Sequence, residues 1–194
     1  ISFNAKKCQV VSISRKRNVA STVYSLGKEK LQEAQSFSYL GVTISSDLRW
    51  NEHVRNVSRK ATRTLNFVKR NIYGCSPETK ARAYMSLVRP QLEYASSVWD
   101  PYTEVLCSEL ERIQRRAARF VKNDYRHTSS VTGMLEDLDW RSLSHRRQES
   151  RLILFFKSVS GKMAIPTSHL QHPLRNTRHA DVLTFIPLSS RINA

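Results

Sequence analysis

One stretch of the chain constrains its fold more than any other, because apolar residues recur there every three or four positions. They are Trp50, Val54, Val57, Ala61, Leu65, Val68 and Ile72. This is the period of an α-helix with a single apolar stripe. At roughly 100° per residue, four arginines fall on the opposite face; they are Arg55, Arg59, Arg63 and Arg70. We therefore expect a helix that buries one side and presents a row of guanidinium groups on the other.

The row of arginines has an ordinary interpretation, a solvated helix face, and two features argue for a binding role instead. Glu52 and Glu78 are the only acids between Arg49 and Arg89. The 194-residue chain also carries 32 Lys and Arg against 16 Asp and Glu, a formal net charge of +16. Such a charge favours a polyanionic partner, first nucleic acid and second an anionic membrane surface. No apolar run approaches the roughly 18 residues of a membrane span. Of the two partners we expect nucleic acid, and no membrane.

The first 46 residues predict a small antiparallel β-sheet or hairpin. Residues 8–14 and 21–26 are rich in β-forming residues and predict two strands, and Gly27-Lys28 predicts a tight turn. Residues 37–44 predict one further strand. Gly41 lies inside it and indicates a bulge or the close approach of another backbone.

Residues 47–125 predict three neighbouring helices. Ser45-Ser46-Asp47 predicts the N-cap of the first helix, which we expect to end near Tyr73. Ser76-Pro77 starts the second helix, in which Pro90 predicts a kink or a break. The third helix is expected over 104–122, and its polar side is basic. Its apolar stripe is expected at Leu106, Leu110, Ile113, Ala117 and Phe120. The polar side contains Arg112, Arg115, Arg116, Arg119 and Lys122.

The remaining chain predicts two more helices and an irregular end. Residues 126–162 contain a short helical pattern over 130–138 and a longer one over 140–159, which ends before Gly161. Residues 163–194 hold prolines 166, 173 and 187, which predict a loop, with one extended segment near 182–186. The fold class is therefore α+β and mostly α.

The sequence shows no catalytic or metal site. The three cysteines lie far apart, no Gly-rich phosphate loop occurs, and acids are sparse with no Asp-Asp pair. Spacing alone would let His169 and His172 share a metal, but chance explains it better because partner ligands are missing. Most aromatic side chains are expected in the core, and a few could stack on bases. We predict no cofactor and no enzymatic activity for this chain by itself.

Several stretches in fixed order carry a resemblance to a known family. They are Phe3-Asn4-x-x-Lys7-Cys8, Tyr39-Leu40-Gly41-Val42, Trp50-x-x-His53, Lys60-Ala61, Val88-Arg89-Pro90-x-Leu92-Glu93-Tyr94-Ala95, Val98-Trp99-Asp100-Pro101 and Gln114-Arg115-Arg116-Ala117-Ala118-Arg119-Phe120. The string resembles the C-terminal part of reverse transcriptases from LINE-type (non-LTR), jockey-like retrotransposons. It extends from Ile1 to about Gly161, and its specificity comes from the whole string, since any single piece is weak.

The resemblance implies a division of labour within a longer polyprotein. Residues 1–46 would be the end of the palm with its primer-grip hairpin, 47–125 the helical thumb, 126–162 linker helices and 163–194 an irregular, truncated tail. The catalytic aspartates, and the Mg²⁺ that they hold, would lie in an upstream palm that is missing here. Partners would be RNA, an RNA–DNA template–primer and the upstream palm and fingers. The protein would be intracellular, nuclear and cytoplasmic as a ribonucleoprotein.

The resemblance also implies roles for individual residues. Lys7 matches a palm lysine near the incoming nucleotide, a possible accessory to nucleotidyl transfer. The segment Tyr39-Leu40-Gly41 matches the primer grip, where a glycine lets the backbone approach the primer. The arginine rows match the surface of the thumb that contacts the duplex, which for RNA is bound through its shape, phosphates and 2′-hydroxyls. Two alternatives stay open: a stand-alone basic adaptor for nucleic acid or protein, and a relic without selected function.

Overall fold

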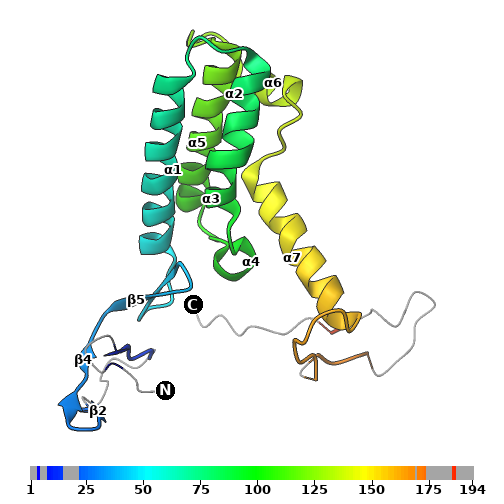
Figure 1. The fold of residues 1–194 in the computed structure, drawn as a ribbon. Helices are drawn as coiled ribbons and strands as arrows, with labels where there is room; N and C mark the ends of the chain where they lie inside the picture. Colours follow the sequence, from blue (N-terminus) through cyan, green and yellow to red (C-terminus); the bar gives the residue numbers. More distant parts are fainter. Residues whose placement is uncertain (1–3, 5–7, 15–21, 169, 174–184, 187–194) are drawn as a thin grey trace. The chain divides into compact units, whose positions relative to one another are not determined.

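The computed structural model describes residues 4, 8–14, 22–168, 170–173 and 185–186. The chain divides into two compact units, residues 1–147 and 148–194, and the main hydrophobic core belongs to the first. The fold is α+β and mostly helical, as the sequence predicts, with short strands near the N-terminus followed by helices (Figure 1).

The strands of the described residues form three two-stranded sheets. β1 (Gln9–Val10) pairs in parallel with β4 (Gln32–Glu33), and β2 (Ser25–Leu26) pairs antiparallel with β3 (Glu29–Lys30). Within the predicted strands at 8–14 and 21–26, the described residues pair over only two positions each. The predicted turn at Gly27-Lys28 is confirmed, and Gly27 adopts a φ of +63° there.

Residues 37–44 form a hairpin, so the prediction of one strand was wrong. β5 (Ser36–Tyr39) pairs antiparallel with β6 (Val42–Ser45) around a two-residue turn. Both turn residues have positive φ, +47° at Leu40 and +82° at Gly41. This geometry matches the twist of the flanking strands and favours glycine. The close neighbour of Gly41 is the ring of Tyr94, whose Cε1 would lie 3.5 Å from an added Cβ.

Helix α1 (Asn51–Asn71) begins later than the sequence predicts. Asp47 does not cap it. Its Oδ1 accepts hydrogen bonds from the backbone N–H of Arg49 at 2.9 Å and from the hydroxyl of Ser45 at 2.6 Å. The Ser45 hydrogen bond, followed by that from Arg49, lowers the pKa of Asp47. These bonds close a turn ahead of the helix, and the chain becomes helical only after Trp50.

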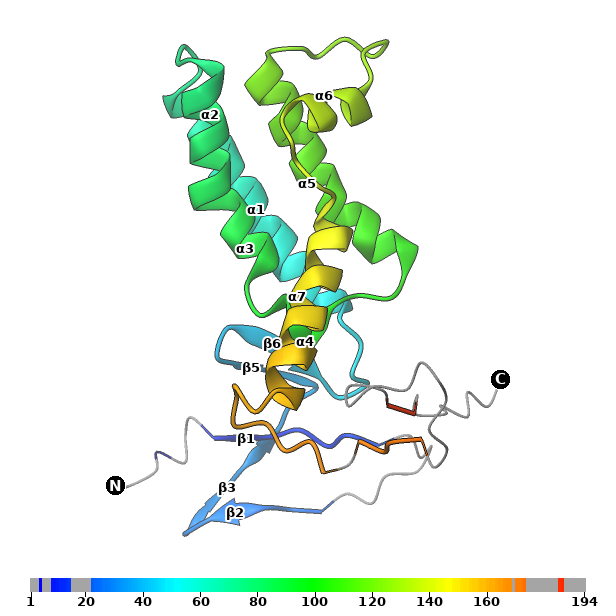
Figure 2. The same cartoon turned by 90° about the vertical axis from the view of Figure 1, so that its right-hand side faces the viewer.

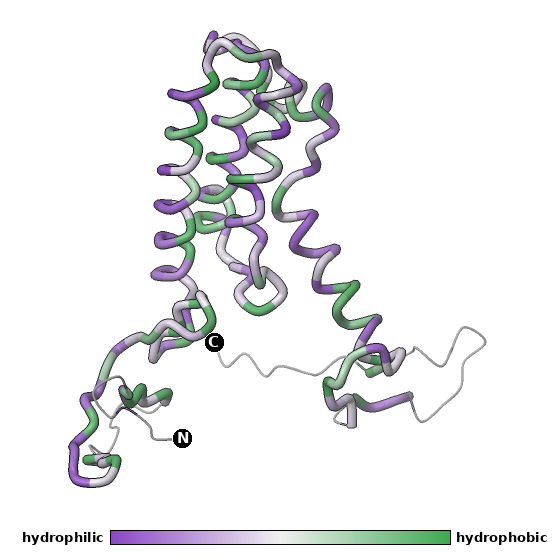
Figure 3. Tube along the Cα trace, viewed as in Figure 1, coloured by the Kyte–Doolittle hydropathy of each residue, from purple (hydrophilic) through white to green (hydrophobic). Residues whose placement is uncertain are grey.

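The apolar stripe of α1 is confirmed. Val54, Ala61, Leu65 and Val68 are buried, and the other stripe residues pack against them half-buried. The four arginines of the opposite face are exposed. Figure 3 shows hydrophobic and hydrophilic residues alternating along this helix as the two faces predict.

The second predicted helix runs through Pro90 without interruption, so the predicted break at this residue does not occur. It consists of α2 (Pro77–Ala83), a π-helical segment η2 (Tyr84–Val88) and α3 (Arg89–Glu93). Proline lacks an N–H and crowds the carbonyl four residues before it. The π segment accommodates this, because the N–H of Arg89 reaches back five residues to the carbonyl of Tyr84. The predicted start is confirmed, since the hydroxyl of Ser76 accepts from the N–H of Thr79.

Three further helices follow the short α4 (Ser96–Trp99). α5 (Glu104–Lys122) matches its predicted range, and its predicted stripe is buried. α6 (Val131–Asp137) is capped by the hydroxyl of Ser130. α7 (Leu143–Val159) starts three residues after the predicted position. Of the predicted extended segment near 182–186, only residues 185–186 are among the described residues. His169 lies outside them.

The core lies where α1, the helix from α2 to α3, and α5 pack together (Figure 2). Tyr84 is fully buried, donates to Oε1 of Gln114 at 2.9 Å and stacks on Trp140 with ring centroids 4.4 Å apart. Gln114 in turn donates to the carbonyl of Arg141 at 2.9 Å. The core therefore extends beyond residue 125, through Trp140 to Leu143.

Candidate nucleic-acid interface

A groove of about 410 Å³ lies between α1 and α5, and arginines from both helices line it. We call the set of five the arginine groove: Arg55, Arg59, Arg63, Arg112 and Arg116. The other lining residues are Ser58, Thr62, Glu109 and Ile113. The structure thus brings together two basic faces that the sequence predicted on separate helices.

Helix geometry explains how the groove forms. α1 and α5 pack on each other, and residues of both helices line the groove beside the seam between them. Arg55, Arg59 and Arg63 are spaced by four residues, which places them on one side of α1 about 6 Å apart along the helix axis. Their side chains therefore form a line that runs parallel to the seam.

The arginine groove carries charge that the described part of the chain does not neutralise. None of its five guanidinium groups is in an ion pair there, and Glu109 is the only acid among the lining residues. Arg116 donates to Oδ1 of Asn66 at 3.3 Å, which orients it without cancelling its charge. Five positive charges that line one groove create a positive electrostatic potential there, and this potential attracts an anion.

The other arginines predicted for the site lie elsewhere. Arg70 and Arg115 are exposed but do not line the groove. Arg119 is half-buried and donates to the backbone carbonyls of Asp124 at 3.3 Å and Arg126 at 2.8 Å, so it fixes the loop after α5. Lys7 lies outside the described residues.

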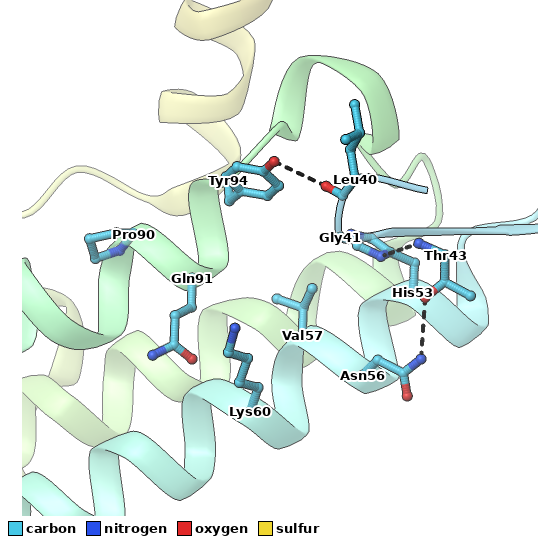
Figure 4. A pocket seen from close by; sticks show the side chains of 10 residues that line it. All are labelled: Leu40, Gly41, Thr43, His53, Asn56, Val57, Lys60, Pro90, Gln91 and Tyr94. Carbon is cyan, nitrogen blue, oxygen red and sulfur yellow. Dashed lines mark hydrogen bonds between the residues drawn. The ribbon is translucent and has the colours of Figure 1, made fainter. Parts of the chain in front are cut away.

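The hairpin tip borders a second cavity, of about 460 Å³ (Figure 4). Its lining residues are Leu40, Gly41, Thr43, His53, Asn56, Val57, Lys60, Pro90, Gln91 and Tyr94. The hydroxyl of Tyr94 donates to the carbonyl of Leu40 at 3.0 Å and joins the hairpin to the end of α3. Tyr39 and Leu40 themselves are 61% and 74% exposed, which leaves the predicted tip accessible.

His53 is a buried residue of this cavity that sequence reasoning did not assign to the site. Its Nδ1 accepts the backbone N–H of Thr43 at 3.1 Å, and its ring meets Trp99 edge to face at 4.7 Å. Nδ1 is therefore unprotonated, and burial lowers the pKa of the ring. The proton lies on Nε2, for which the described residues provide no acceptor. The sequence signals were its place beside Val54 on the inner face of α1 and its position in the motif piece Trp50-x-x-His53.

Among the residues that the structure describes, no group of three His, Cys, Asp or Glu side chains could hold a metal ion. Among the helices that the structure describes, none is both long and apolar enough to cross a membrane.

Comparison of the chain with models of protein families, with curated proteins and with solved structures gives no match.

Proposed function

We propose that this chain is the thumb and linker portion of a LINE-type reverse transcriptase and that its arginine groove binds an RNA-containing template–primer duplex. The observation that carries the proposal is the groove itself, five guanidinium groups on two helices with a single acid among the lining residues. Arginine suits this task because its planar guanidinium group can bind two phosphate oxygens at once, without contacting the edges of the bases.

A contact between two parts of the motif string supports the family assignment. Leu40 belongs to the primer-grip motif and Tyr94 to a motif more than fifty residues later, and the two are joined by the 3.0 Å hydrogen bond. Residues that resemble the family at separate places in the sequence thus converge at one end of α1. In the proposed assembly an upstream palm carries out phosphoryl transfer while this part holds the duplex.

A titration across salt concentrations tests the proposal. If each groove arginine neutralises one phosphate, the slope of log affinity for an RNA–DNA hybrid against log salt should be about −3.5 to −4.5. The triple variant Arg55→Ala/Arg59→Ala/Arg63→Ala should reduce the magnitude of that slope by about 2 to 3. No binding at low salt, or a slope near zero, would overturn the proposal.

A charge-matched variant separates the groove from the net charge of the chain. Lys28, Lys30 and Arg82 are exposed and do not line the groove. Replacing all three by alanine removes the same charge, and we expect it to leave the slope nearly unchanged. If both triple variants lose affinity equally, general basicity explains binding, and the stand-alone adaptor becomes the better account. Reading the same frame upstream of Ile1 for an Ala-Asp-Asp motif then tests the polymerase assignment independently.

A further inference from the structure

Two lysines share one aromatic ring at the end of α1 distant from the hairpin. Nζ of Lys80 lies 5.0 Å from the ring centroid of Phe120 and 5.5 Å from that of Tyr73. Nζ of Lys69 lies 5.7 Å from the centroids of both Phe120 and Tyr125. We call these five residues the lysine–aromatic cluster. It joins the end of α1, α2 and the end of α5 with the loop that follows.

Neither ammonium group is in an ion pair or a hydrogen bond with a described residue. Lys80 is only 5% exposed. Ring faces attract a cation, but they do not replace acceptors for its three N–H donors. A charge with little access to solvent and no counter-ion is unfavourable. The two ammonium groups beside Phe120 therefore leave positive charge that an anion would neutralise.

The cluster continues the arginine groove. Lys69 follows Arg63 on α1 by six residues, about 9 Å along the axis. Burial is the main cause that lowers the pKa of Lys69, and the charge of Arg116, a groove residue, lowers it further. A polyanion that occupies the groove therefore has a cationic continuation at this end.

The tyrosines give the cluster a second chemical property. Tyr73 is 63% exposed and Tyr125 is 54% exposed, whereas Phe120 is buried beneath them. Their proximity is evident from Tyr125, whose pKa is raised by burial and then by Tyr73. Exposed rings beside a phosphate-binding cation are what single-stranded nucleic acid requires, since an unpaired base can stack on them while a paired base cannot.

We propose that the lysine–aromatic cluster binds the single strand that extends from the duplex in the arginine groove, with a backbone phosphate between Lys69 and Lys80 and an unpaired base on Tyr73 or Tyr125. This inference rests on the proposed function.

Binding of the whole chain to three forms of one RNA–DNA hybrid tests the proposal. The first form is blunt, the second carries a four-nucleotide single-stranded extension, at the 5′ or the 3′ end in separate samples, and the third carries the same extension without bases. We expect the base-bearing extension to raise affinity about tenfold over the blunt hybrid, the size of one stacked base. The abasic extension should give a smaller gain, through phosphate alone.

Variants assign the gain to residues. Tyr73→Leu/Tyr125→Leu should abolish the difference between base-bearing and abasic extensions and leave affinity for the blunt hybrid unchanged. Tyr102→Leu is the matched control, because Tyr102 is 80% exposed and lies outside the cluster. Lys69→Gln and Lys80→Met should abolish the gain from the abasic extension. If Lys80→Met fails to fold, Lys69→Gln, at a half-buried position, still decides.

The possible failures can be distinguished. If the wild-type chain binds the blunt hybrid but gains nothing from either extension, the inference is wrong and the proposed function stands. A gain that survives both sets of substitutions also refutes the inference, because the strand then binds elsewhere. If the blunt hybrid does not bind at all, the proposed function fails and the inference fails with it.

Discussion

The arginines of the groove between α1 and α5 differ from those at the start of α7 in their surroundings. Arg147 is fully buried, and its Nε donates to Oδ1 of Asp100 at 2.8 Å. Arg146 donates through Nε and Nη2 to both carboxylate oxygens of Glu93, the second at 3.1 Å. The five arginines of the groove have no ion pair in the part of the chain that the structure describes. In a chain this basic, the number of arginines does not identify a function. Whether an arginine is paired with a carboxylate separates those that hold the fold together from those available to a ligand.

The largest expected effect comes from removing the carboxylate partner of an arginine at the start of α7. Asp100→Ala leaves the buried guanidinium of Arg147 without its carboxylate, and loss of one partner of a buried pair costs about 3 to 5 kcal/mol. Urea unfolding measures this change in the free energy of unfolding. Arg59→Ala, at an exposed position of the groove, is the matched comparison and should change the free energy of unfolding by less than about 0.5 kcal/mol. Equal effects of the two substitutions would remove the distinction between the regions.

A second prediction compares two arginines of the same helix. Arg119→Ala removes the hydrogen bonds to the carbonyls of Asp124 and Arg126 and should destabilise the fold by about 1 to 2 kcal/mol, less than a fully buried charged hydrogen bond. Arg115→Ala, at an exposed position, should have almost no effect. Thermal unfolding of the two variants measures the difference in stability. If Arg115→Ala were destabilising, exposure alone would not distinguish arginines that stabilise the fold from those that do not.

A third prediction adds a second acid to the lining of the groove. Thr62 lines the groove between Arg59 and Arg63, and Thr62→Glu should place a carboxylate among the guanidinium groups. Hybrid affinity should fall about tenfold, or 1.4 kcal/mol, because the carboxylate competes with phosphate. Thr132→Glu adds the same charge on the exposed side of α6 and should have a much smaller effect. Equal losses would mean that net charge alone governs binding.

The smallest effect concerns His53, a buried group with one partner. Burial holds its pKa below the ordinary value of 6.5, so the unfolded chain takes up the proton first as pH falls. The free energy of unfolding should therefore decrease from about pH 6.5 downward to the folded pKa and be unaffected by this group above that window. His53→Asn keeps an acceptor near the N–H of Thr43 without a titrating ring. Its stability should fall less on acidification than that of the wild-type chain, and parallel curves would contradict the assignment.

The sequence predicted those features that depend on neighbours along the chain. The stripes of α1 and α5 follow from residue periodicity, and the start of α2 follows from a serine followed by proline. Local rules failed where two of them competed. Asp47 has the residue type of a cap, but its carboxylate is held in a preceding turn, and the β-forming run over 37–44 is divided by the positive φ of Leu40 and Gly41.

Features that depend on distant residues were not predictable. The sequence placed Arg119 with the other arginines of α5, and only the loop that folds back to it gives it a structural role. The pairing of Arg147 with Asp100 spans 47 positions, and Arg59 and Arg112 line one groove only because α1 packs on α5. Periodicity shows which face of a helix is basic, but it does not show which two basic faces meet.

Chemical modification of arginine with a dicarbonyl reagent, read residue by residue by mass spectrometry with and without an RNA–DNA hybrid, tests the central claim most directly. We expect Arg55, Arg59 and Arg63 to react in the free protein and to be protected by the hybrid. Arg82 should react in both states, and Arg147 in neither. Groove arginines that react equally with and without the hybrid, while the hybrid is shown to be bound, would contradict the assignment of the groove as the duplex-binding surface.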